Sequence, residues 1–465
     1  MTAKFMLLIA LSVLSFSVSF SQNLIVDAGK KNQVIRSIGV NANPQSWNIN
    51  PKAVAAVLDQ LIDSMGCTSF RLMYDDCDWE AVNDNDDPQK YNWAYYDSVY
   101  RSPRFAGIWE MIRYLNKKGI TDITLSPDGA APKWMGVTIL TAGEEREYAE
   151  TISSMVIFAK KRLTPAIQFS RISPINETTC GGREGVIVTP QQLKTVYHDI
   201  ATALINDSVS EVTIIGPDDC SGWAANAQAI LSDSVLMSKT EFLGQHDYST
   251  NTEKAAGLVK MVKQSRYPDK GVIMTEVNAR CPNCDGGTYN EDYGFDAYAG
   301  PAYQYILQDF NAGVNGVQIW EAYDSRYHHP YRSLTWSMWG IFAVNDTSRP
   351  DVYSKRPHFN VMKQLYRFVK PGDVRIDVSS KLPRMVLTGF SDSTGSKKLI
   401  ITGVNNNASA QVLTGFIKGS KDVHKFSCYL SNARATFKRT KDVMVTRQKF
   451  AATIPAKSVF TLVYQ

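Results

Sequence analysis

Eight short apolar runs, separated by helical segments, recur between about residues 34 and 370 and constrain the fold more than any other feature. They are mostly continuous in hydrophobicity rather than alternating, which is typical of parallel strands that are covered on both faces. Eight strand–helix units predict an α/β fold, a (β/α)8 TIM barrel with enlarged loops. The rival is an open, doubly wound sheet, but no glycine-rich phosphate-binding fingerprint follows the first run. The runs span residues 33–41, 68–74, 120–127, 166–176, 211–218, 241–249, 271–278 and 316–323.

Helix start and stop signals lie between the runs. Asn50 and Pro51 are in the order of an N-cap and a first helical residue, and Gly66 marks the end of that helix. Thr189 and Pro190 open another helix in the same way. These signals support the alternation of strands and helices.

The pattern changes after Gly372 to short β runs with turn residues and no helical periodicity: residues 374–380, 384–393, 398–407, 425–430, 449–455 and 458–465. Residues 371–465 are therefore expected to form a small antiparallel β-sandwich, appended to a barrel that covers residues 34–370. Residues 22–33 include the run NLIVDAGKK, which is expected to add a strand to the sandwich.

Residues 1–21 have the pattern of a cleaved secretory signal, with one early lysine, an apolar run and a small-residue ending at Ser19 and Ser21. The apolar run is shorter than the roughly 20 residues of a membrane span, and no lipid-anchor cysteine follows it. We expect a secreted or periplasmic protein without a membrane span. Its net charge of +5 comes from interspersed charges and gives no sign of a nucleic-acid partner.

Seven cysteines in an exported chain permit disulfides. Cys281 and Cys284 form a CxxC motif without the second pair that a structural zinc site needs, so a local disulfide or two loop thiols is the better interpretation. Cys180 and Cys220 each follow a predicted strand and could bridge neighbouring loops.

Two glutamates end apolar strands of the predicted barrel. Glu177 follows the fourth run in SPINETT, and Glu276 ends the seventh in GVIMTEVNAR. Strands four and seven face each other across such a barrel, and catalytic side chains lie at the carboxyl ends of its strands. Either glutamate alone could simply end a strand; the pair is what glycosidic cleavage requires, since one carboxyl protonates the leaving oxygen while the other attacks or activates water.

The elements SPINE and MTEVN, with the strand spacing around them, resemble glycoside hydrolase family 30 of clan A. The loop SPDGAAPKWM, the tripeptide KPG and the ending IPAKSVFTLV are similar to that family as well. The resemblance implies a retaining hydrolase, with Glu177 as acid/base and Glu276 as nucleophile. Two positions depart from the family pattern: Thr178 stands where a proline is usual, and Asp128 where tryptophan is common.

Further residues at the predicted open face are candidates for supporting roles. Arg71 in a strand would be costly unless paired with a carboxylate, and the resemblance implies that it holds Glu276 ionised. Tyr248 could orient the nucleophile, with His246 beside it, and Asn176 could bind a sugar hydroxyl. Aromatic rings bind the apolar faces of sugars, so substrate contacts are expected at the tryptophans after the strands and at the aromatic run 327–340. The aspartate that differs from the family pattern is a further candidate. These candidates are Trp320, Trp134, Trp47 and Asp128.

The sequence thus predicts an exported, retaining β-glycoside hydrolase acting on a polysaccharide or oligosaccharide, as a monomer without a metal or organic cofactor. The alternative is a non-catalytic carbohydrate-binding protein on a decayed glycosidase barrel. A secreted serine hydrolase is disfavoured, because no GxSxG elbow follows any strand.

Overall fold

The computed structural model describes residues 22–75, 79–129, 131–180, 184–249, 253–281, 283–286, 294–327, 335–394 and 397–465. The expected signal segment, residues 1–21, lies outside the described residues.

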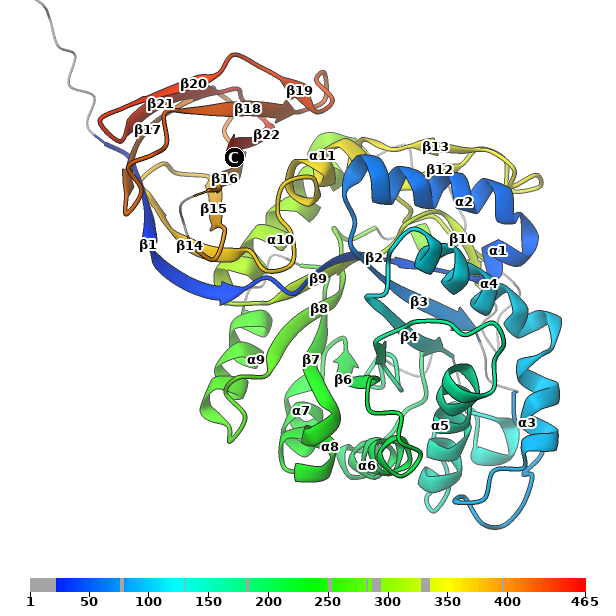
Figure 1. The fold of residues 1–465 in the computed structure, drawn as a ribbon. Coiled ribbons are helices and arrows are strands. Elements are labelled where there is room, and N and C mark those ends of the chain that lie inside the picture. Colours follow the sequence, from blue (N-terminus) through cyan, green and yellow to red (C-terminus); the bar gives the residue numbers. More distant parts are fainter. Residues whose placement is uncertain are drawn as a thin grey trace, which may run out of the picture.

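Eight parallel strands close into a barrel in chain order, from β2 round to β9 (Figure 1). Each strand falls within or overlaps one of the eight predicted runs, so the barrel prediction is confirmed. The fourth strand of the barrel, β5, is only two residues long, although its neighbours β4 and β6 pair with it in register. The strands are β2 (Ser37–Ala42), β3 (Ser69–Asp75), β4 (Ile123–Asp128), β5 (Arg171–Ile172), β6 (Thr213–Asp219), β7 (Thr240–Asp247), β8 (Gly271–Val277) and β9 (Gly316–Ile319).

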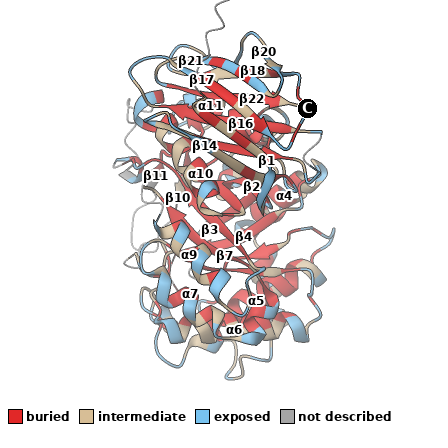
Figure 2. Ribbon diagram, turned by 90° about the vertical axis from the view of Figure 1, so that its left-hand side faces the viewer, coloured by how far each residue is buried: buried red, intermediate tan, exposed pale blue. Residues whose placement is uncertain are grey.

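Helices surround the barrel, and several of them have an exposed outer face and a buried inner face (Figure 2), whereas α5 (Glu145–Lys161) is buried at every position from 147 to 159. The predicted residues cap their helices: the Asn50 side chain accepts a hydrogen bond from the Ala53 amide, and Thr189 forms a capping box with Gln192. Gly66 ends the first of these helical segments with φ 97°, a conformation that glycine adopts without steric cost.

The α-helices are α1 (Gln45–Ile49), α2 (Pro51–Asp59), α3 (Trp93–Tyr100), α4 (Pro103–Lys117), α5 (Glu145–Lys161), α6 (Pro190–Asn206), α7 (Trp223–Leu231), α8 (Ser234–Lys239), α9 (Glu253–Gln264), α10 (Gly300–Ala312) and α11 (Pro357–Tyr366). Short 3-10 or π segments are η1 (Gln60–Met65), η2 (Lys133–Met135), η3 (Cys284–Gly286) and η4 (Phe295–Ala299). Two small hairpins follow β9: β10 (Ser325–Tyr327) with β11 (Thr335–Ser337), and β12 (Phe342–Val344) with β13 (Tyr353–Lys355).

The remaining strands form a second, mostly antiparallel β domain in which β18 also pairs with β22. The N-terminal strand β1 pairs antiparallel with β14 and parallel with β17. Strand β17 lies outside the predicted β runs, because polar and glycine residues interrupt its apolar pattern. The strands are β1 (Leu24–Val34), β14 (Val374–Ser380), β15 (Met385–Ser391), β16 (Leu399–Asn405), β17 (Gln411–Lys418), β18 (Lys425–Ser431), β19 (Lys438–Arg439), β20 (Val443–Thr446), β21 (Lys449–Ile454) and β22 (Ser458–Tyr464).

The β domain packs on the barrel through α10 and α11 (Figure 1). The Tyr303 hydroxyl lies 2.6 Å from the Thr402 hydroxyl, and the Gln364 amide donates to Ser431 Oγ at 2.8 Å. Apolar residues of β15, β16 and β22 join the core cluster of the barrel, so the two parts share buried surface. Within the described chain, none of the helices has the length and apolar character needed to cross a membrane.

Candidate active site

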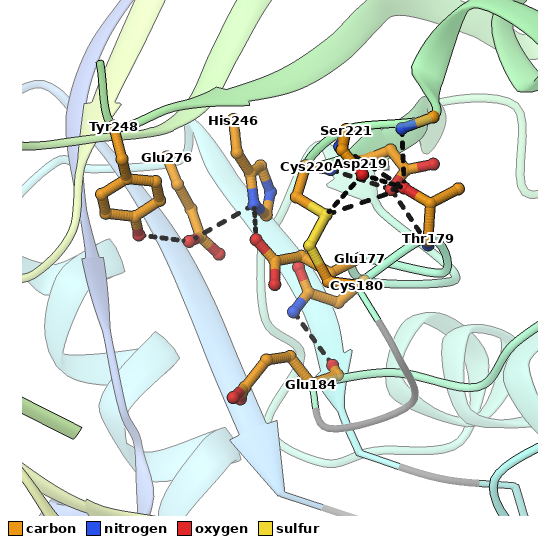
Figure 3. The surroundings of a disulfide bond; sticks show 12 residues. Glu177, Thr179, Cys180, Glu184, Asp219, Cys220, Ser221, His246, Tyr248 and Glu276 are labelled. Atoms are coloured by element: carbon orange, nitrogen blue, oxygen red, sulfur yellow. Dashed lines mark hydrogen bonds and ion pairs between the residues drawn. A yellow bond between two sulfur atoms is a disulfide. The ribbon is translucent and has the colours of Figure 1, made fainter. Parts of the chain in front are cut away.

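The two predicted glutamates meet at the carboxyl end of the barrel (Figure 3). Glu177 follows β5 and Glu276 lies on β8, and His246 of β7 lies between them. One carboxylate oxygen of each glutamate and a ring nitrogen of His246 all lie within 4.8 Å of one another. The two glutamates are far apart in the sequence but close in space, because the barrel brings the ends of β5 and β8 together.

Glu276 is buried and held by donors from two other strands. Arg71 Nη1 of β3 donates to Oε1 at 2.9 Å, and the Tyr248 hydroxyl, just after β7, donates to Oε2 at 2.6 Å. Burial raises the pKa of Glu276, while the positive charges of His246 and Arg71 oppose that effect. Both oxygens of the carboxylate are thus fixed in direction.

Arg71 is fully buried at the centre of the site. Burial alone would lower its pKa, but the adjacent Asp218 and Glu276 outweigh burial and raise it, so the guanidinium stays charged. Its Nη2 also lies 2.8 Å from Asp218 Oδ2. The guanidinium donates to five acceptors: Asn41 Oδ1, Glu276 Oε1, Ser126 Oγ, Asn176 Oδ1 and Asp218 Oδ2.

Sequence reasoning missed Asp218, which lies near the end of β6 and is also fully buried. Ser173 and Thr275 donate their hydroxyls to it, and its Oδ1 lies 3.1 Å from His246 Nε2. Burial would raise the pKa of Asp218, yet Arg71 and His246 lower it well below its usual range. The available signal was its position at the end of the predicted strand 211–218, the same kind of position that identified the glutamates.

His246 contacts all three carboxylates. Its Nδ1 lies 2.7 Å from Glu177 Oε1 and 3.4 Å from Glu276 Oε2. Burial alone would lower the pKa of His246, but Glu276, Asp218 and Glu177 together raise it to about 10. The ring is therefore an imidazolium at neutral pH, and each of its N–H groups is directed at a carboxylate.

A cleft of about 780 Å³ opens over these residues. Five of the predicted supporting or substrate-binding residues line it, together with Trp339: Trp320, Asp128, Asn176, Tyr248 and His246. The full lining is Asp128, Asn176, Glu177, Cys180, Glu184, Cys220, Ser221, His246, Tyr248, Ser249, Lys254, Glu276, Arg280, Cys281, Asp285, Trp320, Tyr327, Ser337 and Trp339.

Trp134 and Trp47 are not among the described residues that line the cleft. The indole N–H of Trp134 donates to the Glu80 carbonyl at 2.9 Å, and the Trp47 ring lies 5.3 Å from the Tyr114 ring. Both tryptophans pack against the hydrophobic core. Trp320 also follows a strand, but its neighbours differ from those of Trp134 and Trp47.

The aromatic run 327–340 brings Trp339 and Tyr327 into the cleft wall, and residues 328–334 of that run lie outside the described residues. The Trp339 ring meets the Tyr248 ring edge-on at 5.3 Å, and the Tyr327 ring lies 5.6 Å from the Trp320 ring. Two aromatic pairs thus flank the carboxylates.

The two departures from the family pattern have different surroundings. Thr178 is buried and its hydroxyl accepts a hydrogen bond from the Val188 amide at 2.8 Å, so it serves the backbone of the loop. Asp128 lines the cleft.

Asn176 is fixed on both sides, because its Oδ1 accepts from Arg71 and its amide donates to the Glu184 carbonyl at 3.0 Å.

Four cysteines are paired in disulfides, Cys180 with Cys220 and Cys281 with Cys284. Among the described residues, two groups have the spacing of metal ligands: Glu177 with Cys180 and Cys220, and Glu177 with His246 and Glu276. The disulfide removes the thiolates of the first group. In the second, His246 Nδ1 lies 2.7 Å from Glu177 Oε1, so these two groups already form a hydrogen bond with each other.

No protein-family model matches the chain. Among curated proteins it is similar to glucuronoxylanase XynC of Bacillus subtilis, with 23% identity over 327 residues, which cover 68% of this chain and 65% of that protein. The chain thus matches slightly less than two thirds of the length of this curated relative.

Solved structures share the fold over nearly the whole chain. A GH30 endoxylanase from Clostridium papyrosolvens superposes with a TM-score of 0.71 at 17% identity, covering 96% of this chain and all of that one. The endo-β1,6-glucanase BT3312 superposes with a TM-score of 0.67 at 16% identity, covering 96% of this chain and 94% of that one. These likenesses confirm the resemblance expected from the motifs: in sequence and in fold, the chain is similar to glycoside hydrolase family 30.

Proposed function

We propose that this protein is an exported, retaining β-glycoside hydrolase that cleaves a polysaccharide by double displacement. The observation that carries the proposal is the approach of Glu177 and Glu276: one carboxylate oxygen of each lies within 4.8 Å of the other. Retaining enzymes hold their two carboxyl groups about 5 to 5.5 Å apart, whereas inverting enzymes leave about 6.5 to 9.5 Å for a water molecule. The spacing favours a direct attack on the sugar.

The surroundings of the two glutamates suit different roles. Arg71 and Tyr248 donate hydrogen bonds to the two oxygens of Glu276, which favours its ionised form and directs it for attack on the anomeric carbon. The Glu177 side chain is more exposed than that of Glu276, at 13% against 6%, as expected of a group that reaches the leaving oxygen. After the leaving group departs, the Glu177 carboxylate removes a proton from the water that releases the sugar.

His246 supplies a positive charge next to both glutamates. With its Nδ1 at 2.7 Å from Glu177 and 3.4 Å from Glu276, the imidazolium offsets the repulsion between two carboxylates at short range. Asp218 holds the other nitrogen of the ring. The positive charge of His246 therefore offsets the negative charge of the two glutamates while Glu177 gives up and regains its proton.

The substrate class follows from the relatives and the cleft together. The similar proteins are named for glucuronoxylan, xylan and β-1,6-glucan cleavage. Trp320 and Trp339 offer aromatic faces in a cleft that suits several sugar units. We infer a β-linked polysaccharide as the substrate.

The test is release of reducing sugar from a panel of plant and fungal β-glycans by the mature protein, beside Glu177→Gln and Glu276→Gln. Glu110→Gln, on the exposed surface of α4, is the matched control and should keep full activity. Release by the wild type that both site variants abolish, with a product that keeps the β configuration in a proton NMR time course, supports the proposal. Glycans that bind but stay intact would favour the binding-protein alternative instead.

A further inference from the structure

Glu177 has a backbone conformation that needs support from its surroundings. Its φ is 45°, in the left-handed region that non-glycine residues rarely adopt. The strand before it, β5, contributes only Arg171 and Ile172 to the barrel, so strand pairing alone does not hold the segment that bears Glu177. Other contacts must therefore keep this carboxylate over the cleft.

Those contacts come from the end of β6 and from Cys220 just after it, and Figure 3 shows the bonds between Thr179 and Asp219 beside the disulfide. The Glu177 amide donates to the Asp218 carbonyl at 3.0 Å. The amide and hydroxyl of Thr179 both donate to Asp219 Oδ1, at 3.1 and 2.5 Å. Cys180, whose amide donates to the Glu177 carbonyl at 2.9 Å, is bonded to Cys220.

The end of β6 is a firm support for this segment. Asp219, the last residue of β6, still pairs with Gln245 of β7 after a register shift that follows Pro217, and strand residues 214–219 are buried. The segment 177–180 is thus tied to the buried end of β6 by hydrogen bonds, and to Cys220 just after it by one covalent bond. Of these ties, the disulfide is the one that water cannot replace.

We propose that the disulfide between Cys180 and Cys220 positions Glu177 for proton transfer to the leaving oxygen. The inference rests on the proposed function, because it assigns the bond to the acid/base step of that reaction. Neither sulfur touches the reacting atoms; the bond acts by fixing the loop on which the carboxyl stands. General acid catalysis depends on this placement, and a misplacement of about 1 Å can cost about 100-fold in rate.

The two hydrogen-bond donors that hold the nucleophile lie outside this loop. Glu276 lies on β8 and is held by Arg71 of β3 and by Tyr248 after β7, all outside the segment 177–180. Loss of the bond should therefore impair protonation of the leaving group and spare the attack on the anomeric carbon. A general loss of stability would instead impair both steps equally.

The bond is accessible to reagents, since Cys180 and Cys220 are both partly exposed and line the cleft. A dithiol such as dithiothreitol transfers two electrons to the bond: the S–S bond breaks, two protein thiols form, and the reagent becomes a cyclic disulfide. An exported protein would meet an oxidising compartment, in which the bond persists.

The experiment compares aryl glycosides of the sugar unit that the wild type releases from its glycan. A 2,4-dinitrophenyl leaving group departs without protonation, whereas a phenyl group needs it. Cys180→Ser/Cys220→Ser should lower kcat/KM about 10- to 100-fold on the phenyl glycoside and less than about threefold on the dinitrophenyl glycoside. Dithiothreitol on folded wild type should give the same pattern, so the result does not depend on folding without the bond.

Cys281→Ser/Cys284→Ser is the matched control, because it removes the other described disulfide at the cleft. Any change it causes should be equal for the two glycosides. An equal loss on both glycosides in the Cys180 and Cys220 variant, or no loss, would overturn the positioning role while the hydrolase assignment stands. A wild type that cleaves neither the glycans nor the aryl glycosides would overturn the proposed function, and the positioning role with it.

Discussion

Replacing Tyr248 by phenylalanine removes one hydrogen bond to the proposed nucleophile and little else. The hydroxyl lies 2.6 Å from Glu276 Oε2. The ring packs edge-on against Trp339 at 5.3 Å, a contact that phenylalanine can keep. Because the Glu276 side chain is only 6% exposed, water has little room to replace the lost donor.

The size of the effect follows from the charge on the acceptor. A hydrogen bond to an ionised group contributes about 1.5 to 3 kcal/mol, which corresponds to roughly 10- to 150-fold in rate. Glu276 loses its charge when it attacks and regains it when the covalent intermediate breaks down. The missing donor should therefore slow the second step most, so kcat falls about 10- to 100-fold and KM falls as the intermediate accumulates.

The assay is steady-state kinetics on the released glycan or its aryl glycoside, with a rapid-mixing measurement of the burst of aryl alcohol that marks an accumulating intermediate. Tyr303→Phe is the control, since its hydroxyl bonds to Thr402 of the β domain, away from the cleft. A kcat within about twofold of wild type, or a raised KM with unchanged kcat, would refute the assigned role, because the latter indicates lost uniform binding.

Three further predictions follow from the same structure. Arg71→Met should lower the free energy of unfolding by about 3 to 5 kcal/mol in denaturant titrations, since two buried carboxylates lose their cation; a wild-type midpoint would contradict this. Burial raises the pKa of Glu150 on α5 from 4.5 to about 9, so the unfolded state releases its proton first and stability falls as pH rises between these values. Glu150→Gln should then raise the free energy of unfolding by roughly 3 kcal/mol at pH 7 and leave it unchanged at pH 4. Thermal melts at both pH values measure this, and an equal shift in Tm at the two pH values would contradict the reasoning. Trp320→Ala should raise KM about 10-fold, whereas Trp134→Ala should lower Tm and leave KM unchanged, because only the first lines the cleft; equal KM effects would argue against that assignment.

Local patterns were sufficient for the barrel and for the two glutamates. Continuous apolar runs and capping residues are properties of neighbouring positions, so the strands and the helices opened by Asn50 and Thr189 could be predicted. Glu177 and Glu276 could be predicted for a related reason: a parallel barrel places the carboxyl ends of its strands on one face, whatever the loops between them do.

The environment of each side chain required the tertiary structure. Trp320, Trp134 and Trp47 all follow strands, yet only Trp320 lines the cleft, because the loops and helices around each tryptophan determine which way its ring lies. The strand β17 was likewise missed, since its pairing partners β1 and β21 hold it in the sheet despite a weak local pattern.

The sequence by itself determined the alternation of strands and helices, the β-rich C-terminal part and the two carboxylates at strand ends. Only the tertiary structure decided how those carboxylates are charged and held. Arg71 and Asp218 are 147 positions apart and lie 2.8 Å from each other, and Cys180 meets Cys220 across 40 positions. Such contacts depend on how the barrel closes, and charges in a buried site depend on distances that spacing along the chain does not specify.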